Sequence, residues 1–205
     1  MEELLACEHD LFTWINSTHT PLTDALLWPF SGTLIWCPVV LVPFWFYLRK
    51  RPDRLPASLS IGLIILLCSI VSDLVFKPLF SRFRPTMHPL YLEQVRLLKE
   101  YTANGLYGFI SGHTTNAFGF AMLSSLLIGK RPYTIGIFVW ALAMGYSRIY
   151  LGAHFVSDVW AGMITGSLLG VLVFFLYRWA TQRYFISHTQ VRRSEERRVG
   201  KECRS

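Results

Sequence analysis

The chain has 205 residues, of which 52% are hydrophobic and 15% are aromatic, and its mean hydropathy is +0.36. This composition is too apolar for an ordinary soluble domain and predicts a compact protein that crosses the membrane several times. The formal net charge of +7 comes mostly from Lys and Arg in short runs between apolar segments and near the C-terminus, which is typical of membrane orientation and argues against nucleic-acid binding.

The N-terminal segment 1–20 is acidic and has no continuous apolar core, so it does not have the pattern of a secretory signal peptide. Its apolar positions recur at helical spacing and predict an amphipathic helix at the membrane interface. These positions are Leu4, Leu5, Leu11, Phe12 and Ile15.

Five apolar runs follow, each long enough to cross a hydrocarbon core of ~30 Å. They cover residues 24–48, 57–76, 110–129, 132–150 and 157–178. The predicted fold is therefore all-α: a polytopic membrane helix bundle of about five transmembrane helices plus the N-terminal interfacial helix.

Short basic loops at 49–54 and 130–132, and the arginines after the fifth run, are placed on the cytoplasmic side by the positive-inside rule. The segment 77–109 and the turn near 150–156 are then outside, and "LYLEQVRLLKEY" within the first of them predicts a short surface helix. The highly charged residues 191–205 predict a disordered tail after a single membrane domain, 1–190.

Polar residues cluster at the outer ends of these runs, where three groups stand out. Lys77 and Arg84 follow the second run on the side where basic residues are not expected. An alternative is simple snorkelling at the membrane boundary, with Lys77 paired to Asp73 one helical turn before it.

The second group, Ser111, Gly112 and His113, opens the third run. Ser111 has the position of a helix N-cap, and the free backbone N–H groups that follow it form an anion site at the positive end of the helix dipole. The alternative is an ordinary cap with an incidental histidine.

The third group lies in "YSRIYLGAHFVSD", residues 146–158. His154 and Asp158 are one helical turn apart, so the carboxylate can accept the Nδ1 proton and leave Nε2 as a nucleophile or base. Arg148 supplies a planar guanidinium suited to phosphate oxygens. The alternative is a charge-balanced helix hairpin without catalytic function.

Together the three groups form a pattern of fixed spacing, which resembles the signature of the type 2 phosphatidic acid phosphatase superfamily, related to vanadium haloperoxidases and bacterial acid phosphatases. The chain departs from it at Ile110, where the family usually has proline. The pattern runs Lys77, six residues, Arg84-Pro85; Ser111-Gly112-His113; Ser147-Arg148, five residues, His154, three residues, Asp158.

The resemblance implies that His154 attacks phosphorus to form a phosphohistidine, that Asp158 holds its tautomer, and that His113 protonates the leaving oxygen. The resemblance also implies that the residues that bind the phosphate are Lys77, Arg84, Ser111, Gly112 and Arg148. No cofactor and no metal are expected, because these cations supply the positive charge and the sequence has no carboxylate cluster for a metal.

The predicted function is a membrane-embedded lipid phosphatase with a lipid phosphate as its partner and an active site on the outer face of a bacterial cytoplasmic membrane. The leading substrates are undecaprenyl diphosphate, phosphatidylglycerol phosphate and phosphatidic acid. The alternatives are a lipid A phosphatase or a lipid phosphotransferase that uses the same site, and a non-catalytic transport protein that binds lipid phosphates.

Overall fold

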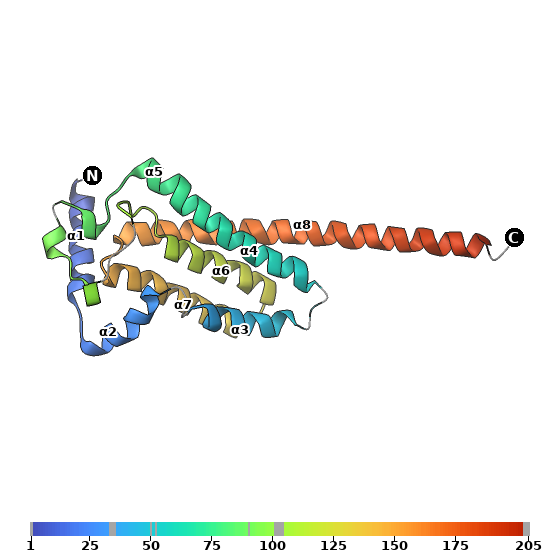
Figure 1. Cartoon of the computed structure of the whole chain (residues 1–205), viewed down its shortest axis with the longest axis horizontal. Helices are drawn as coiled ribbons and strands as arrows, with labels where there is room; N and C mark the ends of the chain where they lie inside the picture. Colours follow the sequence, from blue (N-terminus) through green and yellow to red (C-terminus); the bar gives the residue numbers. More distant parts are fainter. Residues whose placement is uncertain are drawn as a thin grey trace.

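The computed structural model describes the chain except for residues 1, 33–35, 50, 52, 90, 101–104 and 203–205. The fold is all-α, as predicted, and within the described residues the only β-pairing is an isolated antiparallel bridge between Phe83 and Tyr107. The main helices run side by side along the long axis of the molecule (Figure 1). They are α3 (Trp36–Leu48), α4 (Arg54–Ile70), α6 (Gly112–Ile128), α7 (Arg131–Tyr150) and α8 (Val156–Glu202).

Helix α6 is the centre of the bundle, where it packs against α4, α7 and α8. Most of its residues are buried, which is expected of a helix that is apolar on all sides. Its closest neighbour is α8, where Gly162, Gly166 and Gly170 follow one another at intervals of four residues. A Cβ on Gly166 would lie 2.2 Å from the carbonyl oxygen of Thr115, so this close helix crossing requires glycine.

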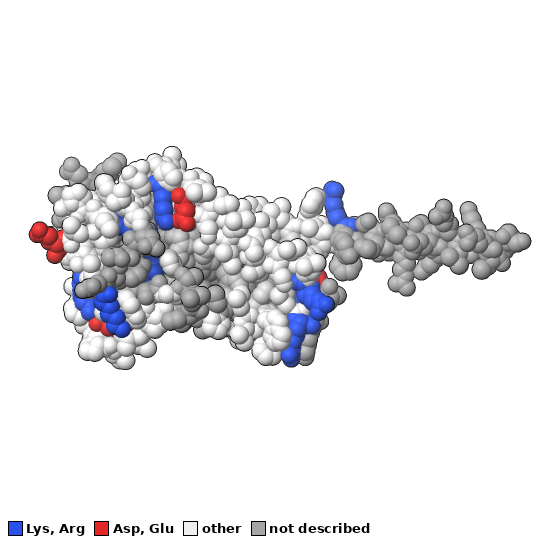
Figure 2. Space-filling view, in the orientation of Figure 1, with Lys and Arg blue, Asp and Glu red and all other residues white. Residues whose placement is uncertain are grey.

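Two helical stretches, Arg54–Phe80 and Val156–Arg183, are long and apolar enough to cross a membrane. In the most apolar part of each, only 28% of the residues are buried, so most of the apolar surface faces outward, as lipid-facing helices require. On the face seen in Figure 2, charged side chains gather at the two ends of the bundle, with uncharged residues between them.

The first of these stretches changes its helical winding near its end. Helix α4 continues through a π-helical turn, Val71–Phe76, into the short helix α5, Lys77–Phe80. Pro78 has no N–H to donate to the carbonyl of Leu74, so the ordinary α-helical hydrogen bond cannot form at this point. Such turns recur at functional sites, and this one carries Asp73 and leads into Lys77.

The first predicted run, 24–48, is not one helix. Its first part belongs to α2, Pro21–Leu27, which is followed by a 3₁₀ turn at Trp28–Ser31 before α3 begins at Trp36. Pro29 and Gly32 explain the break, because proline removes a backbone donor and glycine favours non-helical backbone. The predictions for the other four runs agree with α4–α5, α6, α7 and α8.

Helix α1 (Glu2–Ser17) lies across one end of the bundle (Figure 1). Phe12 and Ile15 are buried against residues of α7 and α8. The Asn16 side chain donates to the carbonyl of Tyr150 at 2.9 Å and accepts the N–H of Arg96 at 2.8 Å. The predicted N-terminal helix is therefore confirmed, and its position at a membrane surface stays a prediction.

The surface helix predicted in the segment 77–109 is wrong. The structure has three 3₁₀ turns there, Pro85–Met87, Leu92–Gln94 and Leu98–Glu100, with Lys99 at a φ of 50°. Contacts with distant residues override the local apolar pattern, since Leu98 is buried in a cluster with residues of α1 and α7 and the N–H of Arg96 donates to the Asn16 side chain of α1. Two of its apolar positions, 90 and 101, lie outside the described residues.

Helix α8 passes the predicted boundary between domain and tail at 190 and extends to Glu202. The division into a membrane domain, 1–190, and a tail, 191–205, stays a prediction.

Candidate active site

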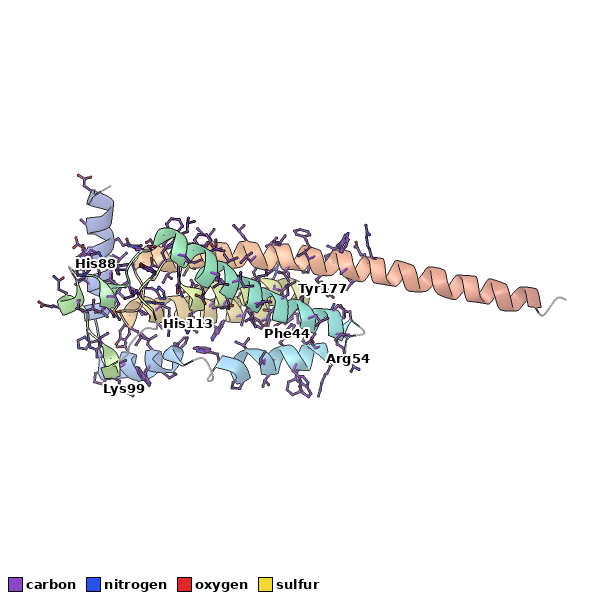
Figure 3. The ribbon with its side chains drawn as sticks, turned by 45° about the horizontal axis from the view of Figure 1, so that its top comes forward. Phe44, Arg54, His88, Lys99, His113 and Tyr177 are labelled. Atoms are coloured by element: carbon purple, nitrogen blue, oxygen red, sulfur yellow. The ribbon has the colours of Figure 1, made fainter. Side chains whose placement is uncertain are left out.

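The three predicted groups lie at the end of the bundle crossed by α1, where α6 and α8 begin and α7 ends; this end is called the site end below. In Figure 3, His113 and His88 lie toward the site end, and Arg54 and Tyr177 lie toward the opposite end. That opposite end holds the loops 49–53 and 129–130 and is called the loop end.

A tight turn between α7 and α8 positions His154. Gly152 has a φ of +75°, which an L side chain rarely adopts, and the N–H groups of Ala153 and His154 donate to the carbonyl of Arg148 at 3.0 and 3.2 Å. Asp158, in the first turn of α8, accepts the N–H of Phe155 on Oδ2 at 3.0 Å. The turn and this cap hold the histidine and the aspartate next to each other.

His154 and Asp158 form the predicted pair. Nδ1 of His154 lies 3.5 Å from Oδ2 of Asp158, which is longer than an ordinary hydrogen bond, and both side chains are buried. On the other side of the ring, Nη1 of Arg84 lies 3.0 Å from Nε2. A guanidinium can only donate, so Nε2 accepts and the ring proton is on Nδ1, facing Asp158.

Burial determines the protonation of His154, which lies in the turn outside the helices. Loss of contact with water lowers its pKa from 6.5 to about 4, although the neighbouring Asp158 acts in the opposite direction and Arg84 and Arg148 act in the same one. The imidazole is therefore neutral at pH 7. A neutral ring with its lone pair on Nε2 has the form that a nucleophile needs.

Arg84 joins the first group to the third. Its N–H donates to the carbonyl of Leu106, its Nε donates to the carbonyl of Gly105, and its Nη1 also donates to the carbonyl of Ala153, all at 3.0 Å. The side chain is only 5% exposed. These bonds fix the guanidinium over Nε2 of His154, where phosphate oxygens would lie during an attack on phosphorus.

The start of α6 joins the second group to the other two. The N–H of Ser111 donates to the carbonyl of Asp158 at 3.0 Å, and a Cβ on Gly112 would lie 3.2 Å from Oγ of Ser72 in the π-helical turn. Ser111 is the predicted N-cap residue, but its side chain makes no capping bond and instead accepts a hydrogen bond from Thr114.

His113, in the first turn of α6, is within electrostatic range of members of both other groups. These are Arg148, His154, Arg84 and Lys77. The three groups therefore converge at the site end. Amides in a first helical turn have no partner within the helix, so the start of α6 adds backbone donors to the side-chain cations.

The two remaining cations are held differently. Arg148 is fully buried, and it donates from Nε to Oγ of Ser147 at 3.2 Å and from Nη2 to the carbonyl of Phe30. Lys77 forms an ion pair with Asp73 at 2.5 Å, so the pairing considered as an alternative is present in the structure. Lys77 must exchange this partner if it is to bind a phosphate.

Sequence reasoning missed two residues that contact Asp158 or its helix. Nη1 of Arg82 donates to Oδ1 of Asp158 at 2.9 Å, and its Nη2 donates to Oε2 of Glu8 in α1 at 2.7 Å. A signal for Arg82 exists, because residues two apart in an extended segment share a face and Arg84 was already a candidate. No local pattern points to Glu8.

Among the residues that the structure describes, no group of three or more His, Cys, Asp or Glu side chains is arranged to hold a metal ion. The expectation of a metal-independent reaction stays a prediction.

Comparisons with known proteins point to one family. The profile of the PAP2 superfamily matches residues 57–182. A lipid A 4'-phosphatase of Porphyromonas gingivalis is 34% identical over 187 residues, which are 90% of this chain and 78% of the relative. A lipid A 4'-phosphatase of Bacteroides thetaiotaomicron is 29% identical over 89% of this chain and 82% of the relative.

Solved structures agree with this similarity. The crystal structure of Aquifex aeolicus LpxE superposes with a TM-score of 0.60 at 28% identity, over 80% of this chain and 92% of that one. The crystal structure of a transmembrane PAP2-type phosphatidylglycerolphosphate phosphatase from Bacillus subtilis superposes with a TM-score of 0.61 at 23% identity, over 89% and 88%, which shows a shared fold.

Proposed function

Because this chain belongs to the PAP2 superfamily and is a membrane lipid phosphatase, we propose that it hydrolyses a phosphate monoester on the headgroup of lipid A. The observation that carries this proposal is the similarity, over about nine-tenths of the chain, to two proteins named lipid A 4'-phosphatase. The substrates placed first from the sequence, undecaprenyl diphosphate, phosphatidylglycerol phosphate and phosphatidic acid, receive less support than the lipid A alternative.

Phosphatidylglycerol phosphate is the second candidate. It is favoured by a phosphatidylglycerophosphatase B of Bacillus subtilis, which is 31% identical over 80% of this chain and 74% of the relative.

In the first chemical step, the Nε2 lone pair of His154 attacks phosphorus, and the bond from phosphorus to the ester oxygen breaks. The neutral ring supports this role, as does the position of Arg84, since its Nη1 can donate to an oxygen of an incoming phosphate in place of Nε2 while its other hydrogen bonds keep the guanidinium where it is. His113 gives a proton to the departing sugar oxygen. The Nδ1 proton stays on His154 and faces Asp158, which stabilises the positive ring.

In the second step, His113 takes a proton from water, and the water oxygen attacks the phosphohistidine. The bond from phosphorus to Nε2 breaks, and free phosphate leaves. Lys77, Arg148 and the amides at Ser111 and Gly112 complete the positive surroundings that the negative phosphoryl group requires. Each group that donates a proton in one step recovers it in the other.

The arrangement in the membrane is part of the same proposal. Helices α3, α4–α5, α6, α7 and α8 make five crossings of a bacterial cytoplasmic membrane. The basic loop end faces the cytoplasm, and the site end faces the periplasm. A site at the end of the bundle suits a substrate whose phosphate lies at headgroup depth while its acyl chains stay in the bilayer.

The substrate is tested with the purified full-length protein and a panel of lipid phosphates: lipid A bearing its phosphates, phosphatidylglycerol phosphate, phosphatidic acid and undecaprenyl diphosphate. Free phosphate and the mass of the lipid product are measured, with His154→Ala as the matched control. We expect the highest kcat/KM on lipid A and one free phosphate for each lipid dephosphorylated. Faster hydrolysis of another lipid, or a phosphorylated second lipid instead of free phosphate, would contradict the proposal.

The chemistry is tested with vanadate and a chelator. Vanadate mimics five-coordinate phosphorus and bonds to an imidazole nitrogen, so we expect it to inhibit, whereas EDTA leaves activity unchanged because side chains supply the positive charge. Activity that disappears with EDTA and returns with magnesium would overturn the metal-independent mechanism.

The orientation is tested by thiol labelling in a background without native cysteines. Single cysteines are introduced at Gln94 in the outer segment and at Lys130 at the loop end, both of which are exposed. A membrane-impermeant reagent applied to spheroplasts is expected to label the cysteine at position 94 and not the one at position 130. The reverse pattern would contradict the proposed orientation.

A further inference from the structure

Arg82 belongs to none of the three motif groups, yet it lies between two carboxylates at the site end. Its Nη1 donates to Oδ1 of Asp158 at 2.9 Å, and its Nη2 donates to Oε2 of Glu8 at 2.7 Å. The guanidinium also lies over the ring of Phe155, 4.6 Å from its centroid. A planar fork with one nitrogen for each carboxylate fixes both of them, which a lysine cannot do.

Glu8 is itself held in place by α8. Its Oε1 accepts the N–H of Ser157 at 2.8 Å and also the hydroxyl of Ser157. The acceptor sites of Glu8 are thus divided between Arg82 and the first turn of α8, one residue before Asp158. Helix α1 is connected in this way to the aspartate that faces His154.

The two oxygens of Asp158 therefore have different tasks. Oδ1 is bound to Arg82, while Oδ2 accepts the N–H of Phe155 and faces Nδ1 of His154. Asp158 is fully buried, whereas the side chains of Arg82 and Glu8 are 26% and 15% exposed. Charges this close act strongly on one another where water is scarce.

We propose that Arg82 is a positioning residue for the phosphatase reaction: it holds Asp158 in place and limits how much of the carboxylate's negative charge acts on His154, while Glu8 offsets the charge of Arg82. This inference rests on the proposed role of His154 as the nucleophile. It adds a chain of three charged residues, Glu8, Arg82 and Asp158, through which α1 acts on the reaction.

Removing the charge of Arg82 and removing the charge of Glu8 are expected to have opposite effects on the pKa of His154. Removing the positive charge of Arg82 leaves Asp158 fully negative toward His154 and raises the pKa of the imidazole. Removing the negative charge of Glu8 leaves Arg82 more positive and lowers it. If the two substitutions only disturbed the structure, there would be no reason for them to shift the pKa of His154 in opposite directions.

Other charged groups also face this region, and both substitutions leave them in place. They are Arg84, Arg148 and His113 around His154, with Lys77 beyond His113, and His88 near Arg82, with His9 beside His88.

The test compares full-length wild type, Arg82→Gln, Arg82→Lys and Glu8→Gln in detergent, with short-chain phosphatidic acid as a soluble probe. The acid limb of kcat/KM against pH reports the group that must be unprotonated in the free enzyme. We expect this limb to move up by about one pH unit in Arg82→Gln and down by a smaller amount in Glu8→Gln. We also expect kcat to fall by up to about 100-fold in Arg82→Gln, with little change in KM.

Arg82→Lys separates charge from position. It keeps the positive charge but cannot bridge two carboxylates, so kcat falls while the acid limb stays near that of wild type. Arg131→Gln and Glu93→Gln, exposed changes of the same kind elsewhere, are the matched controls and leave both quantities unchanged.

The inference is overturned if Arg82→Gln has the kcat and pH profile of wild type, or if Arg82→Gln and Glu8→Gln move the limb in the same direction. If Arg82→Gln does not fold, a Glu8→Gln profile identical to wild type overturns it. His154→Ala is assayed alongside. If His154→Ala stays active, the proposed mechanism itself fails. If it is inactive while the Arg82 and Glu8 variants match wild type, only this inference fails.

Discussion

Each end of the helix bundle holds an aspartate against an arginine, but the two pairs are built differently. At the loop end, Nε and Nη2 of Arg51 donate to the two oxygens of Asp53, both at 2.7 Å, and the hydroxyl of Tyr177 in α8 also donates to Asp53. At the site end, Arg82 binds only Oδ1 of Asp158, and Oδ2 is left to Phe155 and His154.

The difference separates a structural ion pair from a pair at the proposed catalytic site. The hydrogen bond from Arg51 lowers the pKa of Asp53 to about 2, so this carboxylate stays charged and ties the loop before α4 to α8. Asp158 is more deeply buried than Asp53, and its contact with Nδ1 of His154 is long. Residues of the same type thus hold a loop against a helix at one end and lie beside the imidazole of the proposed nucleophile at the other.

The largest effect is expected for the histidine at the site end. His154→Ala removes the proposed nucleophile, and a loss on the order of 10⁶-fold in kcat is typical of removing such a group. Phosphate release measures the loss, and denaturation during turnover of labelled substrate should trap an acid-labile, base-stable phosphoryl group on wild type and none on the variant. His19→Ala, an exposed histidine in the loop before α2, is the control. Label and activity that survive in His154→Ala would refute the assignment.

The same substitution at the two aspartates tests the comparison directly. Asp158→Asn keeps the shape but loses the charge that stabilises the imidazolium, so we expect kcat to fall by about 10⁴-fold, as for triad aspartates. Asp53→Asn is expected to leave kcat within about two-fold of wild type, because surface and structural changes far from the chemistry rarely alter it. Equal losses in the two variants would show that the two ends do not differ in function.

A smaller loss is expected for the second histidine. His113→Ala removes proton donation to the leaving oxygen, which is worth about 10²–10⁴-fold in kcat. A substrate with a good leaving group, such as 4-nitrophenyl phosphate, needs less protonation and should recover part of the rate. If the loss is the same for both substrates, His113 has another role.

The convergence of the candidate site residues was more predictable from sequence than the loops around them, and their catalytic roles stay a prediction. Lys77, Arg84, His113, Arg148, His154 and Asp158 follow a spacing that depends on helix ends. Uninterrupted apolar runs placed α4–α5, α6, α7 and the start of α8 to within a few residues, but not the end of α8 at Glu202. The break at Pro29 was not predicted, although proline and the nearby Gly32 are local signals for it. The glycines at 162, 166 and 170 were also missed, although they have the spacing of close helix contacts.

The remaining features depend on contacts between distant residues. Glu8 and Arg82 are separated by 74 positions, so no local pattern connects them. The segment 77–109 does not form the predicted helix, and Asn16 from α1 binds its backbone at Arg96. Such features depend on which distant segments meet in the folded protein. They cannot be predicted from the spacing of apolar residues along the sequence.

The smallest effect concerns stability at the loop end. Asp53→Asn removes a charged hydrogen-bond acceptor, and because Arg51 is partly exposed we expect the free energy of unfolding to fall by about 1 kcal/mol at pH 7. The pKa of Asp53 is about 2 in the folded protein and 3.8 in the unfolded chain, so the folded state binds fewer protons between these values. The stabilisation is therefore complete above pH 4 and is lost as the pH falls toward 2. The difference in Tm between wild type and variant, measured in detergent, should stay constant from pH 7 to 5 and shrink below pH 4, while Asp10→Asn, an exposed control, shows no such change. If the difference in Tm stays undiminished below pH 4, Asp53 stabilises the fold by its shape and not by its charge. The comparison of Asp53 and Asp158 as two charged partners of arginine would then fail.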